Sequence, residues 1–222
     1  MNGPKDSKTE LVAGIIERAT SHPIRKILVV GCGSGLEAAI LARCLDAEVV
    51  GIDVEDNFDP ASARSADLQL GDATALSFEN NTFDFIYSYH ALEHIPDPGK
   101  ALSEMNRVLK DDGGFWVGTP NRLRLLGYLG SKDASLWDKI HWNYIDWKAR
   151  LLGRFRNEMG AHAGFARGEL YAMLRTEFSH VDDVTDIYFS TLYSGHQKLL
   201  RILSATGLSV VTYPSVYFMG KK

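Results

Sequence analysis

The sequence predicts an α/β fold built on a doubly wound, mostly parallel β-sheet. Residues 27–30 and 48–53 form short apolar runs without polar alternation, which is typical of strands that are covered on both faces. Residues 36–45, between the two runs, have helical periodicity. A glycine-rich turn follows the first run directly. Strands that alternate with helices in this way indicate a parallel sheet.

The composition is that of one globular domain. The chain has 222 residues, of which 45% are hydrophobic and 23% are charged. These values exclude a mainly disordered chain, a collagen-like chain and a coiled-coil rod. We expect a single domain over 1–222, with an added subdomain. The net charge of −4 provides no global field for binding nucleic acid, so no nucleic-acid partner is expected.

Cysteine usage and hydropathy place the protein in a reducing compartment. Cys32 and Cys44 cannot form a disulfide framework and lack metal-ligand spacing, so we expect no metal. No run of about 18 apolar residues is present, which predicts no membrane span. Residues 1–10 are polar, unlike a signal peptide, and indicate a frayed tail. The expected localisation is cytoplasmic.

The elements of the first half follow in order. Apolar residues at helical spacing predict a first helix that ends at Pro23. After the strand at 48–53, further strands are expected at 67–70 and 83–89.

A helix start is predicted at Asp97, because an N-cap carboxylate is followed by Pro98 at the first helical position. Gly113 and Gly114 predict the end of that helix. The fifth strand is expected at 115–118.

Residues 121–160 interrupt the alternation and predict a helical insertion. Apolar residues at steps of three and four indicate an amphipathic helix whose apolar side packs down on the domain. These residues are Trp137, Ile140, Tyr144, Trp147 and Leu151. Further along the chain we expect a helix around 170–174, a strand at 178–189, a helix at 197–205 and a last strand at 216–219.

The glycine turn and the end of the second strand predict a ligand site. Gly31, Gly33 and Gly35 allow a tight turn and a close approach of a ligand to the backbone. Asp53 ends the second strand, where a carboxylate accepts hydrogen bonds from a ribose diol. An adenosine-type ligand is predicted at the switch point of the sheet, with an ordinary tight turn as the alternative. The spacing G-x-G-x-G differs from the G-x-G-x-x-G of dinucleotide folds, since Leu36 takes the place of the third glycine.

Seven motifs in order carry a family resemblance over about residues 24–121. They are Val29-Val30-Gly31-Cys32-Gly33-Ser34-Gly35, Gly51-Ile52-Asp53, Gly71-Asp72-Ala73-Thr74-Ala75-Leu76, Asn81-Thr82-Phe83-Asp84, Ala91-Leu92-Glu93-His94-Ile95-Pro96-Asp97, Arg107-Val108-Leu109-Lys110 and Thr119-Pro120-Asn121. The chain resembles the class I S-adenosylmethionine-dependent methyltransferases, most of all the small-molecule branch that includes ubiquinone-biosynthesis methyltransferases. It departs from the family at Val29, where an Asp or Glu that helps to anchor the methionine end is common.

The resemblance implies a Rossmann-like methyltransferase fold with an antiparallel last strand, and S-adenosyl-L-methionine as cofactor. It places the glycine turn beside the methionine half, Asp53 on the ribose, Asp72 on the adenine amino group, and the residues after the fourth strand near the sulfonium. The implied cofactor-binding residues are Gly31, Cys32, Gly33, Gly35, Asp53, Val54, Asp72, Ala73, Tyr89 and His90. A turn role for Asp72 and a packing role for Tyr89 remain as alternatives.

Four histidines outside the glycine turn bear on catalysis. A hydroxyl acceptor requires a general base, and histidine suits that task near neutral pH. In the resembling family a histidine before the corresponding helix often borders the acceptor pocket, and His162, which has this position, is the predicted base. We expect His141 to be a packing residue and His94 to be structural. His180 has no supporting constellation of residues, so we expect it at a surface or core position without a catalytic role.

The predicted function is therefore methyl transfer to a small-molecule or glycan acceptor, at a hydroxyl. A catalytically inactive methyltransferase-like binding protein and a nucleotide-dependent oxidoreductase are the alternatives, and a homodimer remains open. The insertion at 121–160 is predicted to be a lid that selects the acceptor. Its basic residues would serve an anionic or glycan-linked acceptor; they include Arg122, Arg124, Lys148, Arg150 and Arg154.

Overall fold

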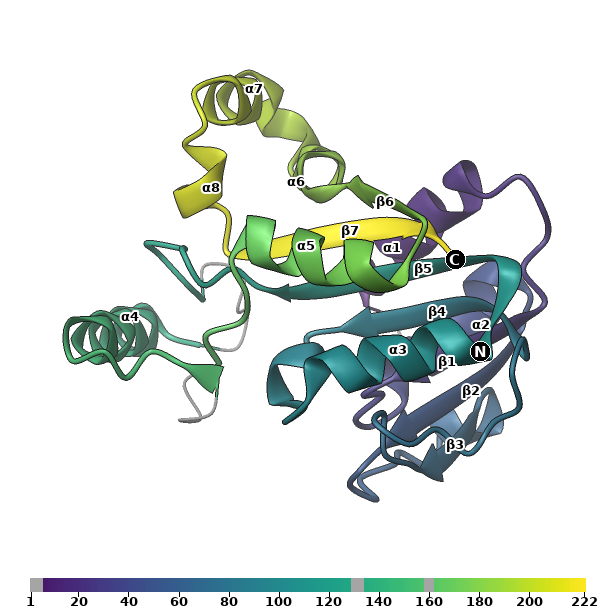
Figure 1. Ribbon diagram of the computed structural model, residues 1–222. Coiled ribbons are helices and arrows are strands. Elements are labelled where there is room, and N and C mark those ends of the chain that lie inside the picture. The colour runs from purple at the N-terminus through teal and green to yellow at the C-terminus, as the bar shows by residue number, and fades with distance from the viewer. Residues whose placement is uncertain (1–5, 129–133, 158–161) are drawn as a thin grey trace.

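A computed structural model describes residues 6–128, 134–157 and 162–222, and shows one mixed sheet with helices on both faces (Figure 1). The strand order is β3-β2-β1-β4-β5-β7-β6. The strands are β1 (Lys26–Val30), β2 (Glu48–Asp53), β3 (Asp67–Leu70), β4 (Phe83–Tyr89), β5 (Leu109–Pro120), β6 (His180–Asp183) and β7 (Ser215–Lys221).

The helices differ widely in length. The α-helices are α1 (Ser7–Ala19), α2 (Leu36–Leu45), α3 (Pro98–Val108), α4 (Leu136–Leu151), α5 (Arg167–Glu177), α6 (Thr185–Leu192), α7 (Gln197–Ala205) and α8 (Ser209–Thr212). The described residues also form the short 3-10 helices η1 (Ser62–Arg64), η2 (Leu92–His94) and η4 (Ser194–His196). Among the described residues, no helix combines the length and the apolar character needed to cross a bilayer.

The topology confirms the predicted fold class. Strands β3, β2, β1, β4 and β5 are parallel, and β7 runs antiparallel to both β5 and β6. Strand β1 pairs with β2 on one side and with β4 on the other, so Val30 lies beside both Ile52 and Ser88. The switch point therefore lies between β1 and β4, where open α/β sheets bind ligands beyond the carboxyl ends of their strands.

The core consists of two apolar layers separated by the sheet. Leu28 and Val30 face the layer that α3 and α5 cover, whereas Ile27 and Val29 face the layer that α1, α2 and α6 cover. Helices α3 and α5 lie in front of the sheet in Figure 1. Because successive side chains of a strand point to opposite faces, an uninterrupted apolar run such as 27–30 serves both layers.

Three predicted boundaries are wrong. Helix α3 starts at its predicted N-cap, where the Asp97 carboxylate accepts from the Lys100 N–H, but it ends at Val108 instead of Gly113. Strand β5 begins at once, and its pairing with β4 shifts register between Phe83 and Phe85. The glycine pair lies inside this irregular strand. At the N-terminus, the polar stretch is helical from Ser7 because the preceding aspartate caps α1.

The predicted strand at 178–189 divides into two elements. Only β6 is extended, and α6 follows it after Val184. Asp182 and Asp183, the charged residues in the middle of the segment, are the last two residues of β6, after which the chain leaves the sheet. Tyr188 and Phe189, two aromatic residues typical of strands, pack into the core from α6 instead. Tertiary packing thus overrides the local β-propensity.

The insertion contains the predicted helix, but its orientation is opposite to the prediction. Ser135 begins α4 through a capping box with Asp138. The apolar stripe of α4 is exposed, and the buried residue of the helix is Asp146. His141, which we expected to pack, is exposed as well. The positions 129–133 and 158–160 of the insertion lie outside the described residues.

Most of the basic residues predicted to serve the acceptor are engaged elsewhere. Arg122 pairs with Glu169 at 3.0 Å, and Arg124 is buried. Arg150 donates to backbone carbonyl groups of the loop after β5. Of the five cations, Lys148 and Arg154 are exposed.

Candidate cofactor and acceptor site

The glycine turn after β1 has the conformation that its sequence requires. Gly31, Gly33 and Gly35 have φ angles of +73°, +51° and +82°, a region that favours glycine. A Cβ on Gly31 would lie 2.2 Å from the Cβ of Ala91. By contrast, a Cβ on Gly33 would meet no atom within 4 Å. A Cβ on Gly35 would lie 2.3 Å from Leu68 Cδ1, so the turn is tightly packed at both ends and open in the middle, where a ligand has room to approach the backbone.

Asp53 ends β2 next to this turn. Its Oδ2 accepts a hydrogen bond from the Gly33 N–H at 2.8 Å, and its Oδ1 accepts from the Glu55 N–H at 3.2 Å. The carboxylate thus joins the open part of the turn to the end of the neighbouring strand. Val54, the next residue, is exposed at the same edge. The predicted ribose-binding residue and the glycine turn are adjacent.

The other residues predicted around the nucleoside have clear local roles. The Asp72 carboxylate accepts from both the N–H and the hydroxyl of Thr74 at 2.8 Å, and these hydrogen bonds lower its pKa. The turn role weighed for this residue is therefore present. Ala73 is buried behind it. Burial raises the pKa of the Cys32 thiol to about 12, so this group stays protonated and is no nucleophile.

Tyr89, at the end of β4, packs among aromatic side chains. Its ring stacks on His90 with centroids 4.5 Å apart. Its hydroxyl lies 3.1 Å from the Tyr217 hydroxyl and 3.3 Å from that of Tyr188. Burial raises the pKa of the Tyr89 and Tyr217 hydroxyls well above their ordinary value. The packing role of Tyr89 is observed, and its contact with a cofactor stays a prediction.

His90 is held in an unusual backbone conformation where the chain leaves β4. Its φ angle is +54°, and its N–H donates to the Gly118 carbonyl oxygen at 2.7 Å. The Nε2 atom lies 3.2 Å from the Ser215 hydroxyl. Burial, with a smaller contribution from the positive charge of Lys8, lowers the pKa of His90 to about 3. The imidazole is therefore neutral at physiological pH.

The predicted base, His162, lies against a second histidine. The rings of His162 and His94 meet edge to face, with centroids 4.6 Å apart. His162 is exposed, and its φ angle is +41°. Burial, and next the neighbouring His162, lowers the pKa of His94. The residue that we expected to be structural thus contacts the predicted base directly.

Two charged residues lie beside these histidines: Arg124, which the sequence analysis named as a basic residue for the acceptor, and Glu93, which it gave no role. Glu93 is buried, and its Oε2 has no hydrogen-bond partner within 6–128, 134–157 and 162–222. Burial raises the pKa of Glu93 to about 7. Arg124 donates to the carbonyl oxygen of His162 at 3.3 Å. Glu93 belongs to the motif at 91–97. The carboxylate directly before His94 in that motif could have indicated a charged residue at the site.

These side chains line one cavity of about 510 Å³ at the carboxyl ends of β4 and β5. The cavity brings His162 together with Tyr89 and His90 but not with the glycine turn or Asp53, which lie at the ends of β1 and β2. Its ionisable lining residues include Lys8, Tyr89, His90, Glu93, His94, Arg124, Tyr128, His162, Tyr188, Tyr193 and Tyr217. The site thus has a nucleoside-type half and a cavity half, and Tyr89 and His90 are the predicted cofactor residues that line the cavity.

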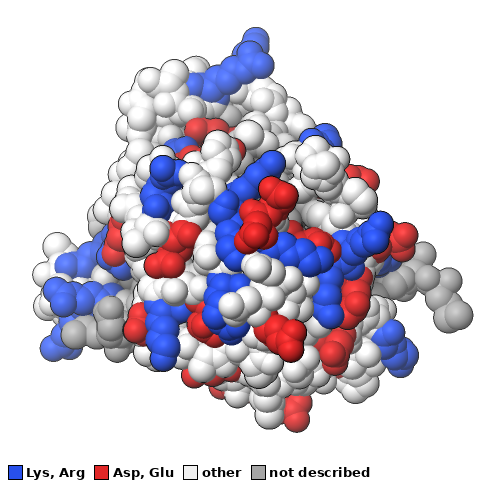
Figure 2. Space-filling model, turned by 45° about the vertical axis from the view of Figure 1, so that its right-hand side comes forward, with Lys and Arg blue, Asp and Glu red and all other residues white. Residues whose placement is uncertain are grey.

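Together these features define the class of protein. An open α/β sheet with a glycine turn and a strand-end carboxylate at its switch point is a nucleotide-type ligand-binding fold. The face shown in Figure 2 carries Lys and Arg interspersed with Asp and Glu. Among the described residues, no group of three or more histidine, cysteine or acidic side chains is arranged to hold a metal.

Comparison with known proteins identifies a domain within the chain. Residues 28–117 match the sequence profile of a family described as methyltransferase domain. The chain is similar to a chloroplastic tocopherol O-methyltransferase of Arabidopsis thaliana, with 31% identity over 133 residues that cover 53% of this chain and 38% of the relative. It is similar to a demethylmenaquinone methyltransferase of Staphylococcus aureus, with 40% identity over 96 residues that cover 40% of each chain. The chain therefore spans about two fifths of the length of these curated relatives.

Solved structures confirm the fold. The YcgJ protein of Bacillus subtilis is similar at a TM-score of 0.59 and 19% identity, covering 96% of this chain and 97% of that one. Phosphoethanolamine N-methyltransferase 2 of Haemonchus contortus is similar at a TM-score of 0.62 and 17% identity, covering 99% and 53%. Residues 28–117 therefore carry a methyltransferase domain, the kind of domain that the motifs predicted.

Proposed function

We propose that the protein transfers a methyl group from S-adenosylmethionine to a hydroxyl group of a small-molecule acceptor bound in the cavity. The observation that carries this proposal is the pair His162 and His94 in a cavity that Tyr89 and His90 also line. The relatives are named for tocopherol and demethylmenaquinone, which favours an acceptor with a ring hydroxyl over a glycan.

The residues present fit the cofactor. Gly33 leaves open space at a positive φ angle, and Asp53 holds a carboxylate beside it. Gly31, Cys32 and Gly35 would complete the methionine end, and Asp72 and Ala73 would lie at the adenine. When bound, the cofactor supplies a methyl group that is already activated on a sulfonium. Much of the acceleration then depends on how well the protein positions the nucleophile.

The chain's own residues would handle the proton. As the acceptor oxygen forms its bond to the methyl carbon, the carbon–sulfur bond breaks, and the hydroxyl proton passes to a ring nitrogen of His162. Burial lowers the pKa of the neighbouring His94, so its ring is neutral. When His162 takes up the proton, it therefore does not lie against another positive charge. The buried tyrosine hydroxyls stay protonated and donate hydrogen bonds. The part of the cavity that these tyrosines line is therefore polar but uncharged.

Ligand binding and turnover test the proposal together. Calorimetry with S-adenosylmethionine, with its demethylated product and with NAD should show affinity for the first two only. Labelled methyl groups should pass to hydroquinone or phenol acceptors and not to sugars. Tight cofactor binding without transfer to any acceptor of a broad metabolite set would instead support the inactive binding protein, and preferred binding of NAD would refute the proposal.

The base assignment has its own experiment. His162→Ala should lower kcat by about 10²-fold or more, because a positioned base contributes that much. The affinity for the cofactor should be unchanged, since His162 lies in the cavity half of the site. His180→Ala, a substitution of an exposed histidine outside this cavity, is the control. Full activity of His162→Ala on a hydroxyl acceptor would remove this residue from the mechanism.

A further inference from the structure

Helix α4 is attached to the domain by its polar side. Asp146 accepts a hydrogen bond from the Arg124 guanidinium at 3.1 Å, and both side chains are buried. The Asn143 side chain accepts from the Gly127 N–H at 2.7 Å. Arg150 donates to two carbonyl oxygens of the loop after β5, at 2.7 and 2.9 Å. A surface helix usually turns its apolar stripe to the protein, so this arrangement is inverted.

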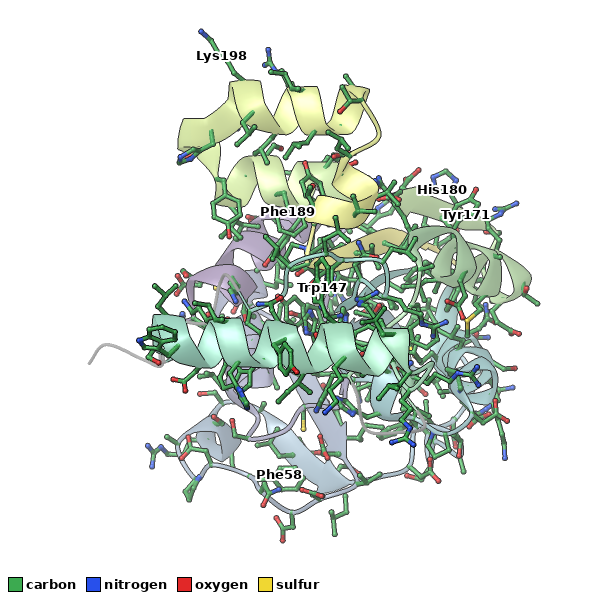
Figure 3. All side chains as sticks on the ribbon, turned by 90° about the vertical axis from the view of Figure 1, so that its left-hand side faces the viewer. Phe58, Trp147, Tyr171, His180, Phe189 and Lys198 are labelled. Carbon is green, nitrogen blue, oxygen red and sulfur yellow. The ribbon has the colours of Figure 1, made fainter. Side chains whose placement is uncertain are left out.

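The apolar side of α4 faces outward. Trp137 is 78% exposed, Tyr144 63% and Leu151 88%. Ile140 and Trp147 lie between them on the same face, because residues three and four apart share one side of a helix. Figure 3 shows α4 crossing the foreground at this end of the molecule. We call these five residues the outer face of α4.

The outer face continues onto the preceding loop. A shallow groove of mainly apolar character is lined by Leu126 together with Leu136, Ile140, Tyr144 and Trp147. Leu123 and Leu125 are also exposed in that loop. Monomeric soluble proteins rarely expose large contiguous apolar patches unless the patch binds something.

The charges around the outer face are mostly positive. Lys148, Arg154 and Arg156 are exposed at the C-terminal end of α4 and just after it. Over residues 134–157 the exposed acid is Asp138, whose carboxylate accepts from the N–H and the hydroxyl of Ser135. This edge therefore complements a negatively charged surface, in contrast to the net charge of −4 for the whole chain.

We propose that the outer face of α4 binds the surface of a membrane that contains anionic lipids. A helix with aromatic and aliphatic residues on one side and cations beside them lies in the plane of the headgroups. Trp and Tyr are favoured there because their rings are apolar and their N–H or O–H remains hydrated. A second copy of the chain fits less well, since a symmetric contact would bring the same cations together.

The location gives the contact a consequence for the site. Arg124, which holds the inner side of α4 through Asp146, also lines the cavity and donates to the carbonyl oxygen of His162. Membrane binding would therefore take place on the helix whose inner side contacts a residue that lines the acceptor cavity. Lipid binding does not depend on methyl transfer, so the membrane proposal and the proposed function stand or fall separately.

Vesicle flotation tests the proposal directly. The full chain should float with vesicles of phosphatidylcholine and phosphatidylglycerol, and float less with phosphatidylcholine alone or at high salt. The triple variant W137S/Y144S/L151S should bind the mixed vesicles at least about tenfold more weakly, because it loses most of the inserted apolar area. Lys148→Gln should weaken binding about fivefold, which corresponds to one cation near an anionic surface.

Two controls distinguish membrane binding from a loss of fold or a contact between copies. Leu70→Ser removes an exposed leucine at the far end of the sheet and should leave flotation unchanged. Circular dichroism should be the same for all variants, because the substituted side chains are exposed. If the wild-type chain does not float, or if the triple variant floats equally well, the proposal is wrong. A concentration-dependent dimer that the triple variant abolishes, without vesicle binding, would assign the face to a second copy.

Discussion

At the residue scale, Asp53 joins the two features that first pointed to a cofactor. It ends β2, and it accepts a hydrogen bond from the N–H of Gly33, the glycine of the turn whose Cβ position is open. The strand-end position was readable from the sequence, because an apolar run stopped at a carboxylate. The hydrogen bond to the turn was not readable, since it depends on the parallel pairing of β1 with β2.

Replacing Asp53 with Ala should weaken S-adenosylmethionine binding at least about tenfold, because hydrogen bonds to a charged group contribute about 1.5–3 kcal/mol each. The melting temperature without ligand should change little, since the carboxylate is only partly buried. Calorimetry and thermal melting measure the two quantities. Asp67→Ala, on the neighbouring β3, is the matched control. Unchanged affinity in a folded Asp53→Ala variant would show that the ribose binds elsewhere.

Glu93 predicts a pH dependence of stability. Burial raises its pKa from 4.5 to about 7, so the folded state binds the proton more tightly than the unfolded state. The resulting stabilisation is complete below pH 4.5 and is lost as the pH rises through about 7. Glu93→Gln, which cannot ionise, should match the wild type in acid and exceed its stability above neutrality, by about 3 kcal/mol at most.

Denaturant unfolding at several pH values measures this difference. Glu48→Gln is the control, because the Glu48 side chain is 65% exposed and should show no comparable change with pH. A constant difference between Glu93→Gln and wild type at every pH would mean that the carboxyl does not titrate in this window.

At the element scale, a buried ion pair decides how α4 is attached. The Arg124 and Asp146 side chains are 5% and 10% exposed. Asp146→Ala would leave the guanidinium buried without its carboxylate, which typically costs about 3–5 kcal/mol. Amide exchange of α4 should then accelerate by about 10²-fold. Glu48→Ala removes an equally short but exposed pair with Lys26, at 3.1 Å, and should cost less than about 1 kcal/mol. Equal effects of the two substitutions would contradict this account.

At the scale of the whole molecule, the insertion is predicted to act as a lid over the cavity. It leaves from the carboxyl end of β5, and its residues Arg124 and Tyr128 line the cavity. Amide exchange over 134–151 should slow when cofactor and acceptor bind together, because lid closure excludes water. Exchange in α7, which lies outside the cavity lining, is the internal reference. Equal protection of α4 in all ligand states would leave a fixed cover instead of a lid.

Local sequence determined the sheet and the nucleoside half of the site. Each β-α step joins an apolar run to a helix that is close in the sequence, and the glycine turn lies within one such step. Glycine at positions 31, 33 and 35 permits the positive φ angles that the turn adopts. The N-cap at Asp97 was predictable as well, because a carboxylate that precedes a proline is typical of a helix start.

The tertiary structure alone decided the cavity half and the orientation of α4. Tyr217 reaches Tyr89 across 128 positions because the last strand enters the sheet antiparallel, next to β5. The periodicity of α4 defines two sides of a helix but not which side faces the domain. Polar residues outside the helix determine which side faces the domain. The buried Arg124 guanidinium would be left without a counter-charge if Asp146 pointed outward, and that cost exceeds the gain from burying the apolar side.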